Sequence, residues 1–186
     1  MAASVEIHPV TPDRWDDVAR LAGDRGFYSG CWCMWWRLPG RDFSAQSATQ
    51  HRGGLKRLVA DGTVPGLLAY VGEQPVGWVA VAPREEYPRL NRSPKLEPVD
   101  ETPVWAVTCF VIERRHRRQG VAEALLGAAV EYARSHGATA VEGVPIDTAG
   151  EKRTSADLYT GTLGMFQQAG FVEIARRGGR PIVRRT

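Results

Sequence analysis

The sequence predicts a mixed α/β domain of three layers, with helices packed on both faces of one sheet. Two observations support this fold class. In the first half of the chain, apolar runs follow one another across short turns, as in β-hairpins, whereas in the second half apolar runs alternate with amphipathic helices, as in βαβ units. The chain has 186 residues and shows no internal repeat or linker, so we expect residues 1–186 to form a single domain.

The first expected elements are a short strand and an amphipathic helix. Residues 5–7 alternate as a strand does, and a threonine–proline–aspartate run at 11–13 is typical of a helix start. This helix has apolar residues at helical spacing and is expected to end near Gly23 or Gly26. Residues 45–60 indicate a second helix.

The middle of the chain predicts a hairpin, a long loop and a strongly apolar strand. Residues 66–71 and 76–82 are apolar runs separated by a polar turn. Residues 83–103 contain prolines and charges and are expected to form a loop, and loops of this length in compact domains are usually functional. Residues 104–112, rich in β-branched and aromatic side chains, predict a strand, and residues 120–136 predict an amphipathic helix.

The last elements complete the alternation of strands and helices. Residues 139–144 predict a strand, which a polar loop connects to a helix ending at Gly170. Residues 171–176 and 181–184 predict two further strands around a glycine turn.

Composition excludes several classes of protein. Hydrophobic residues make up 43% and charged residues 24%, which favours a packed core over disorder. The formal net charge of +3 is too small to indicate a nucleic-acid binder, and no apolar run approaches the ~20 residues that span a bilayer. Residues 1–6 lack the features of a secretory signal, and three cysteines are too few for a disulfide framework. We therefore expect a cytoplasmic protein that binds neither nucleic acid nor membrane.

The most informative segment, residues 104–122, runs from a strand through a basic turn into a helix. The first backbone N–H groups of a helix have no partner within it, and with the aligned peptide dipoles they form an anion site. Gly120 leaves room for a phosphate there, and Ala122 allows close approach of the backbone. An ordinary turn with a solvated basic loop would show the same charges, and the P-loop and dinucleotide-binding glycine patterns are absent. Four arginines flank the turn: Arg114, Arg115, Arg117 and Arg118.

Three segments resemble the GNAT superfamily of N-acetyltransferases. Residues 117–122, Arg-Arg-Gln-Gly-Val-Ala, match its Arg/Gln-x-x-Gly-x-Gly/Ala signature, and residues 108–112 look like its central strand. Residues 165–171, Met-Phe-Gln-Gln-Ala-Gly-Phe, are similar to its C-terminal Leu-Tyr-Glu-Lys-Leu-Gly-Phe element. The resemblance implies a GNAT-like three-layer α/β fold with a mixed, mostly antiparallel central sheet, flanked by helices and splayed at the central strands. It also makes a homodimer a reasonable expectation.

The resemblance implies acetyl-CoA as the acyl donor. Its pantetheine arm would pair with the central strand, whose matching residues are Phe110, Val111 and Ile112. Such pairing needs a gap beside that strand, and Pro145, which cannot donate to a ladder, agrees with a gap. Its pyrophosphate would lie on the amides of the loop–helix junction, which match Arg117, Arg118, Gln119, Gly120, Val121 and Ala122.

The implied reaction is direct attack of a primary amine on the thioester, but the acid and base are not obvious. The family's usual acid is a tyrosine whose position here is occupied by Phe166, which cannot donate a proton. Tyr159, Cys109 or solvent are the candidates for protonating the leaving thiolate. The candidate bases are Asp147, Glu142, Glu85 and Glu86. The adjacent pair Glu85 and Glu86 can also attract a cationic amine, so we count it among the acceptor-binding residues.

An aromatic segment at residues 31–36, Cys-Trp-Cys-Met-Trp-Trp, has two interpretations. Trp32, Trp35 and Trp36 either pack in the core of the first helical layer or form an aromatic wall of the acceptor pocket, since ring faces suit a cationic amine or a flat ring. No metal site is predicted, because the Cys-x-Cys pair has no second cysteine pair and no nearby histidine.

The sequence thus favours an acetyl-CoA-dependent N-acetyltransferase acting on a small-molecule amine, because an aromatic-lined pocket behind a long loop is more closed than a peptide groove. Two alternatives stay open. One is a protein lysine or N-terminal acetyltransferase. The other is a catalytically weak acyl-CoA-binding or sensor module, which Phe166 favours. Nucleic-acid binding through the arginines at 114–118 is disfavoured, because no stacking platform adjoins them.

Overall fold

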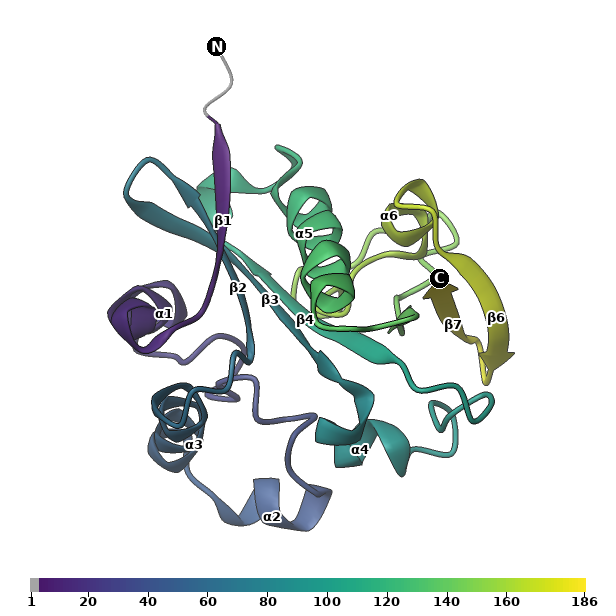
Figure 1. Ribbon diagram of the computed structural model, residues 1–186, viewed down its shortest axis with the longest axis horizontal. Coiled ribbons are helices and arrows are strands. Elements are labelled where there is room, and N and C mark those ends of the chain that lie inside the picture. The colour runs from purple at the N-terminus through teal and green to yellow at the C-terminus, as the bar shows by residue number, and fades with distance from the viewer. Residues whose placement is uncertain (1–3) are drawn as a thin grey trace.

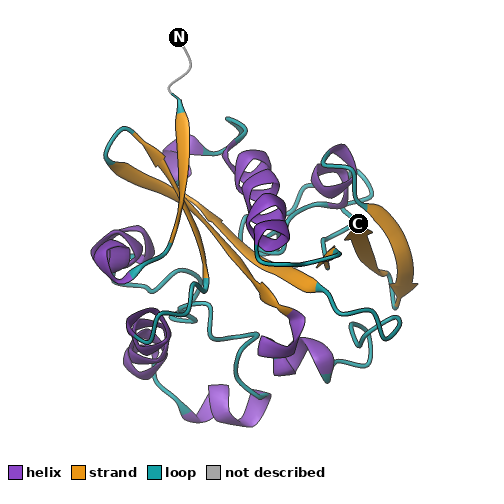
Figure 2. Ribbon diagram, viewed as in Figure 1, coloured by secondary structure: helices purple, strands orange, loops and turns teal. Residues whose placement is uncertain are grey.

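A computed structural model of the protein describes residues 4–186, so the first three residues of the segment compared with a secretory signal lie outside it. Within the described chain, one sheet of seven strands has the order β1-β2-β3-β4-β5-β7-β6 (Figures 1 and 2). Neighbouring strands are antiparallel except β4 and β5, which run parallel. The prediction of a mixed, mostly antiparallel sheet is confirmed. No helix within residues 4–186 combines the length and the apolar character that crossing a membrane would require.

The bounds of the elements are as follows. The strands are β1 (Val5–Pro9), β2 (Gly66–Val71), β3 (Gln74–Pro83), β4 (Trp105–Ile112), β5 (Val141–Gly143), β6 (Val172–Arg177) and β7 (Arg180–Arg185). The α-helices are α1 (Trp15–Ala22), α2 (Gly40–Ala45), α3 (Ala48–Ala60), α4 (Pro88–Asn91), α5 (Val121–Ser135) and α6 (Leu163–Gln168). Short 3-10 helices are η1 (Pro12–Arg14), η2 (Arg84–Glu86) and η3 (Arg114–His116).

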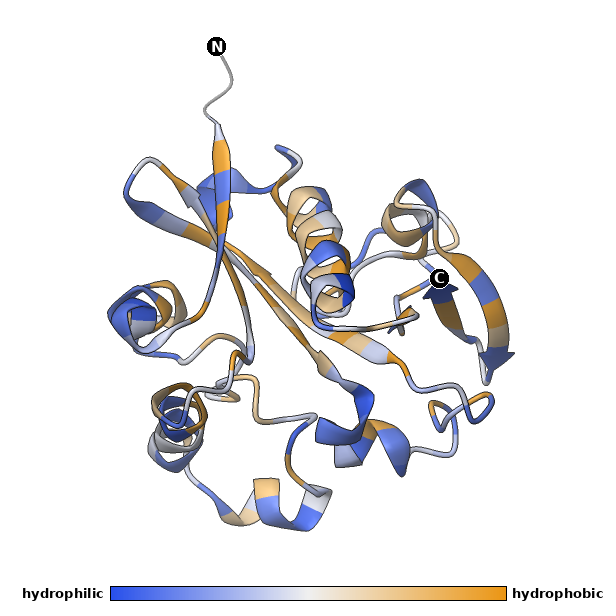
Figure 3. Cartoon of the chain, in the orientation of Figure 1, coloured by the Kyte–Doolittle hydropathy of each residue, from blue (hydrophilic) through white to orange (hydrophobic). Residues whose placement is uncertain are grey.

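Two faces of the sheet carry separate helical layers, as Figure 1 shows with α5 on one side and α1 and α3 on the other. Alternation along β2 explains the division, because Leu67 packs in the cluster that holds the apolar side of α5, whereas Leu68 packs with α1 and α3. The central strands are therefore apolar along most of their length (Figure 3). The three-layer fold predicted from the sequence is confirmed.

Two expected helices differ from the prediction. The run at 11–13 begins with the 3-10 turn η1, and the Thr11 hydroxyl accepts from the Arg14 guanidinium at 2.9 Å instead of capping the backbone. The helix expected at 45–60 is divided into α2 and α3, because Ser47 starts a new helix with a capping box. The Gln50 N–H donates to the Ser47 hydroxyl at 3.3 Å, and the Ser47 N–H donates to the Gln50 amide oxygen at 2.8 Å.

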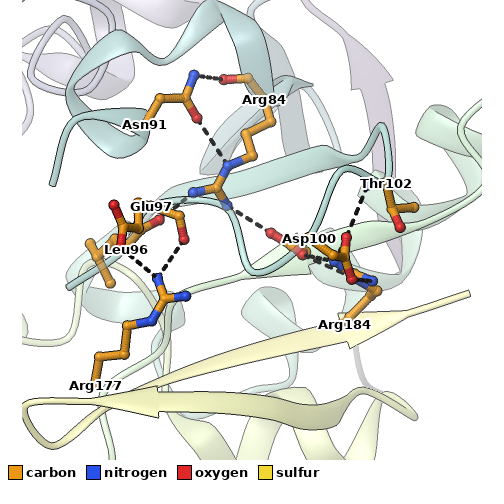
Figure 4. A network of polar contacts seen from close by, with 9 residues as sticks. Arg84, Asn91, Leu96, Glu97, Asp100, Thr102, Arg177 and Arg184 are labelled. Carbon is orange, nitrogen blue, oxygen red and sulfur yellow. Dashed lines mark hydrogen bonds and ion pairs between the residues drawn. The ribbon is translucent and has the colours of Figure 1, made fainter. Parts of the chain in front are cut away.

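The segment expected as a loop at 83–103 contains η2 and α4 and is fastened to the sheet by a polar network (Figure 4). Arg84 donates to Glu142 of β5 at 2.7 Å, to Asn91 at 3.0 Å and to the Leu96 carbonyl. Arg184 of β7 reaches the other oxygen of Glu142 at 2.7 Å. The network joins the segment to β5 through Glu142 and to β7 through Arg184.

Candidate active site

The sheet opens between β4 and β5. In the described chain these strands pair through Trp105–Val107 and Val141–Gly143, after which β5 ends and β4 continues to Ile112. Gly143 lies directly against the ring of Phe166, where an added Cβ would be 2.2 Å from a ring carbon. Beyond Val107, the edge of β4 opposite β3 has no neighbouring strand among the described residues. The expected splay between the central strands is therefore present.

Backbone groups of Phe110 and Ile112 occupy this open edge. The Glu113 N–H donates to the Val76 carbonyl of β3 at 2.8 Å, and alternation along an antiparallel strand turns the groups of residues 112 and 110 the other way. The Phe110 N–H donates to the Tyr159 carbonyl at 2.6 Å. A loop of the protein itself thus uses one of the groups that we expected pantetheine to pair with.

The turn after β4 delivers an uncapped helix N-terminus to the same edge. Gly120 has φ of +80°, a left-handed conformation that glycine adopts without strain, and it is the N-cap of α5. The Ala124 N–H donates to the Gly120 carbonyl at 2.9 Å, so the N–H groups of residues 121–123 precede the first bond of the helix. Among the described residues no side chain caps them. These N–H groups lie where the sequence predicts an anion site.

A cavity of about 240 Å³ connects this helix N-terminus with the open edge of β4. Arg117 bridges it, because its guanidinium donates to the Ile112 carbonyl at 3.0 Å and to the Ser155 hydroxyl at 2.8 Å. Six of the predicted donor-binding residues line the cavity: Phe110, Ile112, Arg117, Arg118, Val121 and Ala122. The opposite wall includes Ser155, Leu158, Gly161, Thr162 and Met165.

Three other predicted donor-binding residues do not line that cavity. Val111 packs with the cluster on the α1 and α3 side of the sheet. Gln119 donates its side-chain amide to the Arg115 carbonyl at 2.8 Å, and Gly120 is exposed at the helix start. The turn keeps unbalanced positive charge, because within residues 4–186 Arg114, Arg115 and Arg118 form no ion pair.

A second cavity, of about 340 Å³, contains the predicted aromatic wall. Trp36 stacks on Tyr159 with ring centroids 6.4 Å apart, and Tyr28 lies 6.1 Å from the same ring. We call this space the aromatic cavity. Its lining comprises Tyr28, Ser29, Cys31, Cys33, Trp35, Trp36, Phe43, Cys109, Ala156 and Tyr159.

The two cavities meet at Tyr28, which lines both of them. Its hydroxyl donates to the Phe110 carbonyl at 3.3 Å on the open edge of β4. Chain neighbours also divide between the cavities, since Phe110 lines the first and Cys109 the aromatic one. A donor held at the helix N-terminus and an acceptor among the rings would therefore approach each other at the edge of β4.

Sequence reasoning missed Tyr28, and the backbone around it explains why. Four residues around it have positive φ, between 44° and 63°, which residues other than glycine rarely adopt: Phe27, Ser29, Trp32 and Cys33. A left-handed path of this kind has no periodicity to recognise. Nearby glycines at 23, 26 and 30 were the available signal, and Gly26 is needed because a Cβ there would lie 2.1 Å from the Trp32 indole nitrogen.

Burial keeps four groups of the aromatic cavity protonated near neutral pH: the hydroxyls of Tyr28 and Tyr159 and the thiols of Cys31 and Cys33. It raises the pKa of Tyr28 and that of Tyr159 to about 12, and the pKa of Cys31 to about 11. Burial likewise raises the pKa of Cys33 well above its usual range. These groups are hydrogen-bond donors at physiological pH.

The carboxylates considered as bases or acceptor-binding groups lie elsewhere. Asp147 pairs with Arg176 at 2.8 Å, a hydrogen bond that lowers the pKa of its carboxyl group. Glu86 pairs with Arg37 at 2.5 Å, and Glu85 lines a different cavity beside residues 100–105. Glu142 is 2% exposed and accepts hydrogen bonds from Arg84 and Arg184. None of the four lines either cavity of the candidate site.

The aromatic residues divide between the core and the site. Trp32 stacks on Trp15 with centroids 6.1 Å apart and is buried in the core, whereas Trp35 and Trp36 line the aromatic cavity. Phe166 is fully buried against Phe171, with ring centroids 4.9 Å apart, and lines neither cavity. Among residues 4–186, no group of three His, Cys, Asp or Glu side chains is arranged to hold a metal ion.

Comparisons with known proteins identify the family. A search of curated proteins found no match. The chain is similar in structure to the PaiA N-acetyltransferase from Thermoplasma acidophilum in complex with coenzyme A, with 9% identity over 98% of this chain and 99% of that chain and a TM-score of 0.57. It is also similar to a GNAT-family acetyltransferase from Streptococcus pneumoniae, with 17% identity over 98% of both chains and a TM-score of 0.53.

These structures share the fold at low identity, and the sequence match is more specific. A model of the acetyltransferase (GNAT) family matches residues 32–165, which include both cavities' walls on β4 and the basic turn. GNAT acetyltransferases use acetyl-CoA, in agreement with the resemblance noted in the sequence. The chain therefore belongs to the GNAT family of acetyltransferases.

Proposed function

We propose that this protein transfers the acetyl group of acetyl-CoA to the primary amine of a small molecule held in the aromatic cavity. The observation that carries this proposal is that two cavities of different chemistry meet at Tyr28 beside the open edge of β4. One has an uncapped helix N-terminus for phosphates, and the other has ring walls for an apolar acceptor. Because the aromatic cavity is partly enclosed by side chains of residues 28–43, a small molecule fits it better than an extended peptide.

The residues at the helix N-terminus suit the diphosphate of acetyl-CoA. The N–H groups of residues 121–123 supply several donors in a row, and Arg118 adds charge without a competing carboxylate partner among the described residues. Acetyl-CoA supplies the reactive thioester when it is bound. On β4, pairing at the Ile112 carbonyl requires Arg117 to move, whereas pairing at the Phe110 N–H requires the Tyr159 carbonyl to move.

Tyr28 is the hydroxyl best placed to assist the leaving thiolate. It lines both cavities, whereas Tyr159 and Cys109 line the aromatic cavity alone. Because burial holds the pKa of Tyr28 near 12, its hydroxyl stabilises negative charge as a hydrogen-bond donor, and solvent completes the proton transfer. We assign Tyr159 to the acceptor wall, where its ring stacks on Trp36. Cys109 is a neighbouring thiol donor on β4.

Formation of an N-acetylated product from acetyl-CoA and an amine tests the proposal. Purified protein is mixed with acetyl-CoA and a panel of small amines, and N-acetylated product is quantified by mass spectrometry beside a reaction without amine. Amine-dependent product supports the proposal. Tight CoA binding without product from any amine or lysine peptide would identify an acyl-CoA-binding module, and product from the peptides alone would identify a protein acetyltransferase.

A further inference from the structure

The aromatic cavity has no carboxylate that could pair with an ammonium ion. Its lining consists of aromatic, thiol, hydroxyl and alanine side chains and includes no Asp, Glu, His, Lys or Arg. Two acids considered as bases in the sequence analysis lie outside the cavity and form ion pairs with arginines: Glu86 with Arg37, and Asp147 with Arg176. A cationic amine entering this cavity would lose its hydration without gaining a carboxylate partner.

Positive charge from the protein already lies at the rim of the cavity. The Arg89 guanidinium carbon is 3.7 Å from the centre of the Trp35 ring and 5.4 Å from that of Phe43. Within the described residues Arg89 has no carboxylate partner, and its Nε donates to the Leu38 carbonyl at 3.3 Å. The guanidinium thus covers one face of Trp35, a residue of the cavity lining, and its positive charge so close to the cavity repels a second cation.

The unused polar group at the cavity is also a donor. Trp36 is 7% exposed and lines the cavity, and its indole N–H is buried without an acceptor from the described residues. An ammonium group needs acceptors for its three N–H bonds, whereas the indole requires an acceptor for its own. The Trp36 indole therefore supplies no acceptor to an ammonium ion.

We infer that the acceptor is an arylamine, an amine whose nitrogen is attached directly to an aromatic ring; the inference rests on the proposed function. The ring would stack among Trp36, Tyr28 and Tyr159. The nitrogen lone pair of an arylamine is delocalised into the ring, so the nitrogen is unprotonated at neutral pH. It can attack without a general base, in accord with a cavity that has no carboxylate.

The transfer balances without any further reactant. The arylamine nitrogen forms a bond to the acetyl carbonyl carbon, the carbon–sulfur bond breaks, and its electron pair goes to sulfur. One proton leaves the nitrogen for solvent and one reaches the thiolate, whose charge the Tyr28 hydroxyl stabilises in the interval. The products are the N-aryl acetamide and CoA.

Two isomeric amines test the inference. 4-Methylaniline and benzylamine have the same atoms and one ring each, but benzylamine is a cation at neutral pH. We expect kcat/KM at pH 7 to be at least about tenfold higher for 4-methylaniline. We expect the benzylamine rate to rise about tenfold per pH unit as the ammonium ion loses its proton, while the 4-methylaniline rate stays nearly constant.

The outcomes separate this inference from the proposed function. Equal or faster acetylation of benzylamine, or efficient acetylation of the polycation kanamycin, would overturn the inference and leave the proposed function standing. Acetylation of other amines but of neither isomer would do the same. Absence of product from every amine, with CoA bound, would overturn both.

A charge added to the cavity wall gives a second, independent readout. Ser29 lines the aromatic cavity with φ of 51°, a conformation that aspartate and asparagine tolerate better than most residues. Relative to Ser29→Asn, Ser29→Asp should move the ratio of rates toward benzylamine by at least about fivefold, because the carboxylate pairs with the ammonium ion. The same ratio in both variants would contradict the inference that charge selects the acceptor.

Discussion

Replacing Glu142 with glutamine should strongly destabilise the fold. The carboxylate is 2% exposed, and its two oxygens accept from Arg84 at 2.7 Å and from Arg184 at 2.7 Å and 3.0 Å. The Arg84 and Arg184 side chains are themselves only 8% and 13% exposed. A neutral amide of the same shape would leave buried guanidinium groups without their counter-charge.

The magnitude follows from the cost of breaking a buried ion pair from one side, about 3–5 kcal/mol. For a chain of this length each kcal/mol lowers the melting temperature by about 2–4 °C, so the expected decrease is about 6–20 °C. Asp100 cannot compensate fully, because it pairs with Arg184 on the exposed side of the network, at 2.8 Å. Arg84 has no second carboxylate within the described residues.

Thermal and urea unfolding followed by circular dichroism measure the effect, with Glu97→Gln as the matched control. Glu97 pairs with Arg177 at 3.8 Å, with 57% of the Glu97 side chain exposed, so its loss should cost less than about 1 kcal/mol. Because Glu142 lies outside both cavities, acetyl transfer by the folded Glu142→Gln protein should persist at low temperature. Equal destabilisation by the two substitutions would refute the reasoning.

Three further predictions test the site and its surroundings. Tyr28→Phe should lower kcat at least about tenfold with little change in KM for acetyl-CoA, whereas Tyr159→Phe should mainly raise KM for the acceptor. Steady-state kinetics measure both effects, and an unchanged kcat in Tyr28→Phe would exclude a role for the Tyr28 hydroxyl in thiolate release. Since burial raises the pKa of Cys31 to about 11, the rate of its alkylation by iodoacetamide should rise about tenfold per pH unit from pH 7 to 10. Peptide mass spectrometry follows the reaction, and a rate that reaches a plateau near pH 8.5 would contradict the raised pKa. Gly143→Ala should cost about 1–3 kcal/mol in urea unfolding because its Cβ would lie 2.2 Å from the Phe166 ring, and wild-type stability would show that the ring is not packed there.

Local patterns explain why much of the fold was predictable. The apolar run of β4 and the periodicity of α5 depend on neighbours along the chain, and both elements lie within one or two residues of their predicted bounds. The helix start at Gly120 was predictable for the same reason, since a strand, a turn and a helix in succession determine it locally. The strand predicted at 139–144 is shorter in the structure, where β5 comprises only Val141–Gly143, the three residues that pair with β4.

The remaining parts of the site depend on contacts distant in sequence. Tyr28 reaches Phe110 across 82 residues from a left-handed segment, which no propensity describes. Glu142 was considered as a base because sequence gives no sign that Arg84 and Arg184 would converge on it, from 58 and 42 residues away. The sequence shows which residues are charged, but it does not show which of them form ion pairs in the fold.

The central claim is that the N-terminus of α5 binds the diphosphate of CoA, and calorimetric titration with CoA tests it most directly. Gly120→Glu places a carboxylate at this site, and at about 5 Å from a phosphate the repulsion is about 3 kcal/mol, or roughly a 100-fold loss of affinity. Gly120→Ala meets the same left-handed φ of 80° without the charge, so it isolates the backbone effect. The account predicts that wild type binds CoA and that the glutamate variant binds it at least tenfold more weakly than the alanine variant. Equal affinities of the two variants, or no binding of CoA by the wild type, would contradict it.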